Sequence, residues 1–139
     1  MILDASVLLA VLNRDDPFHE AALEVVSRGN HAIHAVNLGE VASILFRRDP
    51  AVADEVLDVF MAAPDLEVAY DPVEREAGRL HADRPSRKIS LADCFGAALA
   101  AARSEAVVSA DKDFRWFTET AGIAVQVLAG EERPDRAAP

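Results

Sequence analysis

The sequence predicts a three-layer α/β sandwich built on a short, mainly parallel sheet. Short apolar runs, typical of buried strands, alternate with longer runs whose apolar residues recur at helical spacing. Strands that alternate with helices pair in parallel through right-handed crossovers, and the helices then cover both faces of the sheet. The length of 139 residues suits one domain, and no internal repeat or linker is visible.

The expected elements follow one another along the chain with clear boundaries. Strands are expected at residues 1–3, 31–36, 66–70, 106–109 and 123–128. Helices are expected at residues 5–12, 18–28, 37–48, 50–63, 72–82 and 89–103. Gly29 ends the second helix, and Pro50 and Pro64 bracket the fourth. Residues 1–129 should therefore form the single domain, and 130–139 a flexible C-terminal tail with too little apolar content to pack.

The composition excludes several classes of protein. With 51% hydrophobic and 27% charged residues the chain is an ordinary soluble globular protein, and no apolar run approaches the roughly 20 residues of a membrane helix. The N-terminus carries no positively charged leader, so a cytoplasmic location is expected. The net charge of -10 argues against nucleic-acid binding through a broad positive surface, but a nuclease can draw positive charge from a divalent ion.

Four acidic residues lie where an expected strand ends or an expected helix begins: Asp4, Glu40, Asp93 and Asp111. Ligands bind open α/β sheets beyond the carboxyl ends of the strands, and helices that follow strands begin at that same edge. We therefore expect the four acids in one cleft. Carboxylates repel one another, so such a cleft needs a cation or must hold protons. Carboxylate oxygens suit Mg2+ or Mn2+.

Each acid, taken alone, also fits a purely structural role. Ser90 to Asp93 matches a capping box, Asn37 to Glu40 nearly does, and Asp4 and Asp111 fit caps or turns. Zinc is not expected, because His31 and His34, three apart on a strand, would point to opposite faces. The four histidines are interpreted as surface or packing residues.

Four short motifs give the chain a family resemblance. They are Asp4-Ala5-Ser6, Asn37-Leu38-Gly39-Glu40-Val41, Ser90-Leu91-Ala92-Asp93 and Ser109-Ala110-Asp111-Lys112-Asp113-Phe114. In this order and approximate spacing, between residue 1 and about residue 128, they resemble the PIN domain family, and VapC-type toxins in particular. The resemblance implies a PIN-like, Rossmann-like sandwich. It also implies an Mg2+- or Mn2+-dependent endoribonuclease that is the toxin of a type II toxin-antitoxin pair, usually a homodimer bound to a small antitoxin.

The resemblance assigns roles to individual residues. Asp4, Glu40, Asp93 and Asp111 match the family's acidic quartet, with Asp4 and Asp93 as direct metal ligands. Ser6 and Ser109 match the hydroxyl positions beside the quartet, where they would orient a carboxylate or a water, although both also fit turn or cap hydroxyls. Ala5 stands where many relatives have a hydroxyl residue. Asp113 is a further acid that fits either the site or a cap.

Basic residues near the acids are candidates for contacts with RNA phosphates. Arg87, Lys88 and Lys112 lie a few residues from Asp93 and Asp111. Positive charge there would hold the RNA backbone without reading its sequence. The ordinary alternative is solvated surface charge.

Partners are expected because the helical runs at 5–12 and 50–63 carry more apolar residues than one side of a small sheet buries. We expect some of this surface to form a homodimer interface and some a groove for an antitoxin helix or strand.

Other functions compete with the nuclease. A non-catalytic PIN-like module that binds RNA or protein is the main alternative. A phosphoacceptor domain would need paired acids after the first strand and a lysine after the last, and neither is present. A haloacid-dehalogenase-like phosphatase would need Asp-x-Asp where the chain has Asp4-Ala5-Ser6.

Overall fold

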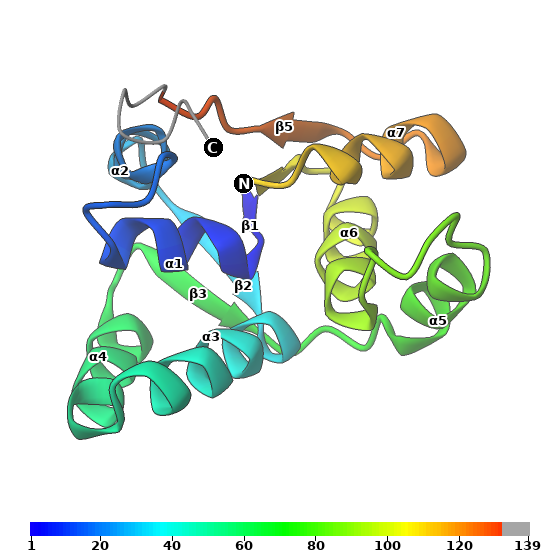
Figure 1. The fold of residues 1–139 in the computed structure, drawn as a ribbon. Helices are drawn as coiled ribbons and strands as arrows, with labels where there is room; N and C mark the ends of the chain where they lie inside the picture. The colour runs from blue at the N-terminus through cyan, green and yellow to red at the C-terminus, as the bar shows by residue number, and fades with distance from the viewer. Residues whose placement is uncertain (132–139) are drawn as a thin grey trace.

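The computed structural model describes residues 1–131 and shows an α/β sandwich with a five-stranded sheet (Figure 1). The strands are β1 (Ile2–Leu3), β2 (His31–His34), β3 (Leu66–Ala69), β4 (Val107–Ser109) and β5 (Val125–Val127). The helices are α1 (Ala5–Leu12), α2 (His19–Ser27), α3 (Ala35–Arg48), α4 (Pro50–Ala62), α5 (Glu74–Ala82), α6 (Leu91–Arg103) and α7 (Arg115–Ala121), with a 3-10 turn η1 (Lys112–Phe114). Most of the expected tail, from residue 132 on, lies outside the described residues.

All strand pairs are parallel, and the sheet order is β3-β2-β1-β4-β5. Ile2 of β1 lies opposite Ala32 on one side and Val107 on the other. The chain builds the sheet outward from β1 to β3 and then returns to add β4 and β5 on the other side. The order therefore reverses between β1 and β4, the position at which open α/β sheets bind ligands.

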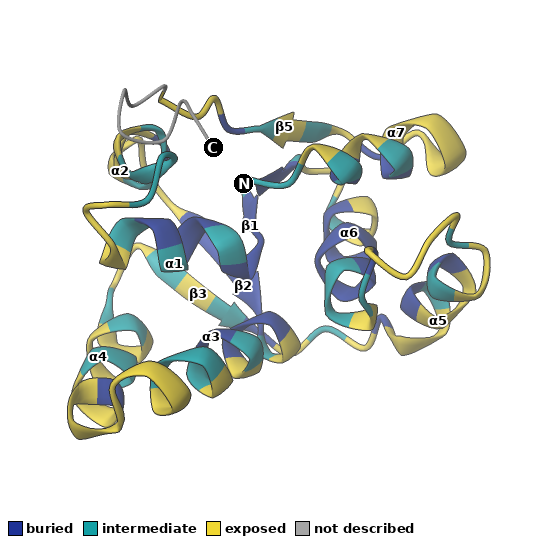
Figure 2. Ribbon diagram, viewed as in Figure 1, coloured by how far each residue is buried: buried dark blue, intermediate teal, exposed yellow. Residues whose placement is uncertain are grey.

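Two apolar cores lie on opposite faces of the sheet, because successive strand residues point to opposite sides. Ile2 packs with α5, α6 and α7, whereas its neighbour Leu3 packs with α1, α2 and α3. Burial differs sharply between helices (Figure 2): α6 is buried along most of its length, but only Ala53 is buried in α4. Within the described part of the chain, no helix is long and apolar enough to span a membrane.

The structure moves some expected boundaries. α3 begins at Ala35, two residues earlier than expected, because Nδ1 of His34 accepts a hydrogen bond from the Val36 N–H and caps the helix. α6 begins at Leu91, not 89, because Ser90 is its cap. The expected elements also omitted α7, whose seven residues are too few to show a helical period, although Phe117 anchors it in the core.

The histidines on β2 do face opposite layers. His31 Nε2 donates to the carbonyl of Val25 in α2, whereas the ring of His34 lies 5.1 Å from that of Phe95 in α6. Both are buried packing residues.

Candidate metal centre

Three of the four predicted acids meet at the carboxyl edge of the sheet. Ligand oxygens of Asp4, Glu40 and Asp93 all lie within 4.8 Å of one another. Asp4 follows β1 and caps α1, and Asp93 lies in the first turn of α6. Glu40 lies in the second turn of α3, not the first as expected, because that helix starts early. The cluster joins three elements that are far apart in the sequence.

Two serines hold Asp4 by one of its oxygens. Oδ2 accepts hydrogen bonds from Ser6 Oγ at 2.6 Å and from Ser109 Oγ at 3.0 Å. Each hydroxyl is fixed in turn, since Ser6 Oγ accepts from the Ala110 N–H and Ser109 Oγ accepts from the Asp111 N–H. Oδ1 of Asp4 is buried and receives no hydrogen bond from the described residues. One oxygen is thus bound by protein, and the other is left for a ligand.

The other two carboxylates are held differently. Asp93 forms the predicted capping box: its Oδ2 accepts from the Ser90 N–H at 2.9 Å, and Ser90 Oγ accepts from the Asp93 N–H at 3.0 Å. The capping role and the cluster role therefore belong to the same residue. Glu40 lacks such support, because its buried Oε2 has no hydrogen-bond partner within residues 1–131.

The electrostatics of the cluster favour protons or a cation. Burial raises the pKa of Asp93 to about 7, and the nearby charge of Asp4 adds to the rise. Burial and the same charge raise the pKa of Glu40. Burial also raises the pKa of Asp4, against the opposing effect of the two serines. Without a cation the cluster would hold protons near neutral pH.

Two features of the cluster suit a bound divalent metal ion. Buried oxygens of Asp4 and Glu40 lack protein partners, although buried polar atoms are normally hydrogen-bonded. The three-residue group contains only carboxylates, which suit hard divalent ions. The residues present therefore fit a Mg2+ or Mn2+ ion.

Asp111 does not join the group of three. Its Oδ1 accepts from the Asp113 N–H at 2.9 Å and caps the turn η1. It remains linked to the cluster, because its own N–H donates to Ser109 Oγ, which donates to Asp4. Asp113 lies in the same turn, where both acids are partly exposed. Of the four acids expected together, three therefore lie close to one another, and Asp111 lies outside their group.

The predicted basic residues flank the cluster in sequence and are exposed. Arg87 and Lys88 precede α6, and Lys112 follows Asp111. None of the three side chains forms an ion pair with a residue that the structure describes.

Asn37 is a buried polar side chain that was not among the residues expected at the site. It was expected to open α3, but it lies inside the helix and is fully buried. The available signal was its spacing: Asn37 lies four residues before the core residue Val41, so it shares that helix face.

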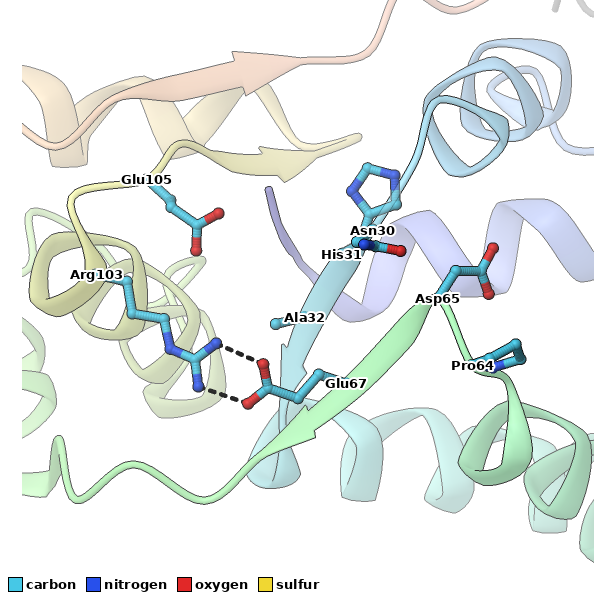
Figure 3. Close-up of a pocket in the computed structure, with 8 residues that line it drawn as sticks. All are labelled: Asn30, His31, Ala32, Pro64, Asp65, Glu67, Arg103 and Glu105. Carbon is cyan, nitrogen blue, oxygen red and sulfur yellow. Dashed lines mark hydrogen bonds and ion pairs between the residues drawn. The ribbon is translucent and has the colours of Figure 1, made fainter.

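A separate polar cavity of about 290 Å³ lies at the opposite, amino-terminal end of the strands (Figure 3). In it the Arg103 guanidinium donates to both carboxylate oxygens of Glu67, at 2.8 and 2.7 Å. Arg103 also donates to Asp71, and the two carboxylates raise the pKa of the guanidinium. The charge of this arginine is thus paired within the protein, and the cavity is remote from the acidic cluster.

Comparison with solved structures finds similar folds. Mycobacterium tuberculosis VapC20, described as a sarcin-ricin loop cleaving toxin, matches with a TM-score of 0.72 at 20% identity, over 83% of this chain and 92% of that one. VapBC2 from Rickettsia felis, bound to a DNA fragment from its promoter, matches with a TM-score of 0.67 at 16% identity, over 92% of this chain and 98% of that one. FitAcB from Neisseria gonorrhoeae matches with a TM-score of 0.60 at 17% identity, over 89% of this chain and 94% of that one.

At these identities the structural likeness shows a shared fold. No curated protein sequence matches the chain significantly. The family model of the PIN domain, however, matches residues 1–119, which include all four acids and both serines. The chain therefore belongs to the PIN domain family.

Proposed function

We propose that the protein is a metal-dependent endoribonuclease and the toxin of a type II toxin-antitoxin pair. The observation that carries the proposal is the cluster of Asp4, Glu40 and Asp93, with two buried oxygens unpartnered among the described residues, in a PIN domain fold. The proposed location is the cytoplasm, where such an enzyme would meet RNA.

The three clustered carboxylates would hold a Mg2+ or Mn2+ ion. When bound, such an ion supplies a nucleophile from water at neutral pH and neutralises charge on the phosphate. Ser6 and Ser109 orient Asp4, and Ser90 orients Asp93. Asp111 is the fourth acid of the proposed site, and its turn is tied to Asp4 through Ser109.

The substrate would be held by phosphate contacts. Arg87, Lys88 and Lys112 are exposed cations a few residues from Asp93 and Asp111 in the sequence, and this supports the proposal that they bind the RNA backbone. Asp113, one residue after Lys112, is proposed as a further acid beside the site.

A basic antitoxin segment is the proposed protein partner. An apolar cavity of about 210 Å³ lies between α1, α2, α4 and the start of β3, and Leu8, Val11, Val26, Val59 and Phe60 line it. The net charge of -10 favours a basic partner and would speed its association. The exposed apolar residues outside this cavity support the proposed homodimer, among them Phe46 and Leu91.

RNA cleavage by the purified chain tests the function. Cleavage should require added Mg2+ or Mn2+, and Asp4→Asn should abolish it while the variant remains folded. Expression in bacteria should arrest growth only with the unmodified chain. Metal-independent cleavage, or equal cleavage by both proteins, would contradict the assignment. RNA binding without cleavage would favour the non-catalytic module.

A further inference from the structure

Asn37 connects two of the helices that carry the acidic cluster. Its side-chain Nδ2 donates a hydrogen bond of 2.9 Å to the carbonyl oxygen of Ala92, the residue before Asp93. Because a carbonyl only accepts, the amide orientation is fixed by this contact. Asn37 itself lies one helical turn before Glu40, on α3. One side chain thus joins the turn before Glu40 to the turn that holds Asp93.

The surroundings of Asn37 are those of a core residue. The side chain is 0% exposed, and its Oδ1 has no hydrogen-bond partner within the described chain. A Cβ atom built on Gly96 of α6 would lie 3.6 Å from that oxygen, an ordinary van der Waals distance, so α6 packs directly against the amide. Burying an amide oxygen without a partner costs free energy, and a leucine would avoid that cost. Stability alone therefore does not explain an asparagine at this position.

Positioning of Glu40 does explain it. Ser6 and Ser109 fix Asp4 and Ser90 fixes Asp93, whereas Glu40 receives no hydrogen bond from residues 1–131. The location of the Glu40 carboxylate thus depends on how α3 is seated. α3 packs against α6, and the Asn37 hydrogen bond is the polar contact at that interface closest in sequence to both acids.

We infer that Asn37 is a positioning residue of the metal centre, which sets Glu40 against Asp93 by anchoring α3 to the first turn of α6. The inference rests on the proposed metal-dependent function. In this role Asn37 contacts neither metal nor substrate. Replacing it should therefore weaken metal binding while all three metal-binding carboxylates remain in place.

Mn2+ binding to the purified protein, measured by electron paramagnetic resonance, tests this role. Asn37→Leu keeps the branched shape of the side chain, with larger terminal groups, and removes both the hydrogen bond and the unpartnered oxygen. We expect an unchanged or higher melting temperature and roughly tenfold weaker Mn2+ binding, the usual loss for an outer contact of a metal site. Asn37→Ala, which cannot clash, should weaken binding similarly at temperatures where it is folded.

A matched control separates positioning from stability. Val25→Ala removes buried methyl groups from α2, away from the cluster, so it should lower the melting temperature and leave Mn2+ affinity unchanged. Wild-type Mn2+ affinity in both Asn37 variants, or an equal loss of Mn2+ affinity in Val25→Ala, would overturn the role of Asn37 and leave the proposed metal site standing. Absence of Mn2+ binding by the unmodified protein would instead overturn the proposed metal site.

Discussion

Ser109 donates a hydrogen bond of 3.0 Å to Asp4 and so joins the carboxyl ends of β4 and β1, the two strands between which the sheet order reverses. The same hydroxyl accepts a hydrogen bond from the Asp111 N–H, so this one buried serine links Asp4 to Asp111. Since Ser6 bonds the same oxygen of Asp4, the two serines together determine which oxygen faces the other carboxylates.

Replacing both serines with alanine should weaken metal binding. The double variant Ser6→Ala/Ser109→Ala removes the two hydroxyl donors that oppose the raised pKa of Asp4, so the ionised, metal-binding form becomes less favourable. We expect a loss of roughly 10- to 100-fold in Mn2+ affinity, measured by titration. Ser43→Ala, on the exposed face of α3, is the matched control and should bind as the wild type does. Equal affinity in all three proteins would contradict the role of the serines.

The stability of the metal-free protein should fall as the pH rises. Burial raises the pKa of Asp93 from its ordinary value of 3.8 to about 7, so the folded state binds this proton more tightly than the unfolded state. The resulting stabilisation is complete below pH 3.8 and is lost as the pH rises through about 7. The raised pKa values of Asp4 and Glu40 act in the same direction.

Urea unfolding in the presence of a chelator measures this pH effect. Asp93→Asn is the control, because asparagine does not titrate, and its stability should change less between about pH 5 and about pH 8. Added Mn2+ should bind more tightly as the pH rises over the same range, since metal and protons compete for the carboxylates. Identical pH profiles for the two proteins would show that Asp93 titrates normally.

Arg103 should matter for stability and not for the metal centre. Its guanidinium binds Glu67 and Asp71 with planar, paired hydrogen bonds that a lysine cannot reproduce. Arg103→Lys should therefore lower the melting temperature modestly, and the difference should shrink in high salt because both carboxylates are at least partly exposed to solvent. Mn2+ affinity should stay unchanged, because Arg103 ends α6 whereas Asp93 lies in its first turn, roughly 15 Å away along the helix axis. A coupled loss of metal affinity would contradict that separation.

Much of the fold and of the candidate centre could be predicted from the sequence. The positions of Asp4 and Asp93 follow from a general rule, since the end of a parallel strand and the start of the next helix share one edge. The predicted start of α3 was wrong, because asparagine is a preferred helix cap and histidine is not. Asn37 was therefore expected to open the helix in place of His34. Tertiary contacts with Asp71 and Phe95 hold His34 in place.

The position of Asp111 depended on local geometry that the sequence does not fix. Asp111 follows β4 by two residues, and its side chain turns toward the Asp113 N–H. Whether such an acid caps a turn or enters a cluster is decided by the path of the following 3-10 turn, which has no periodic signal. The burial of Asn37 likewise became visible only once α6 was packed against α3.

The proposed antitoxin groove should be sensitive to charge at Val59. This residue is 63% exposed on α4 and also lines the apolar cavity beside α1 and α2, so it lies at the rim where a partner would enter. Val59→Glu should leave the fold intact, because the side chain is largely solvated, but should place a charge against any apolar segment that fills the cavity. We expect RNA cleavage to be retained and partner binding to be lost.

Light scattering of the purified chain, alone and with the product of a small neighbouring open reading frame, measures the interaction. Asp58→Ala, at the preceding exposed position of α4, is the matched control and should bind the partner as the wild type does. If Val59→Glu still forms the complex with unchanged affinity, the partner docks elsewhere. If the unmodified chain stays monomeric and ignores that neighbour, both the dimer and the antitoxin proposals fail, and an RNA- or protein-binding module becomes the better account of the exposed apolar helices.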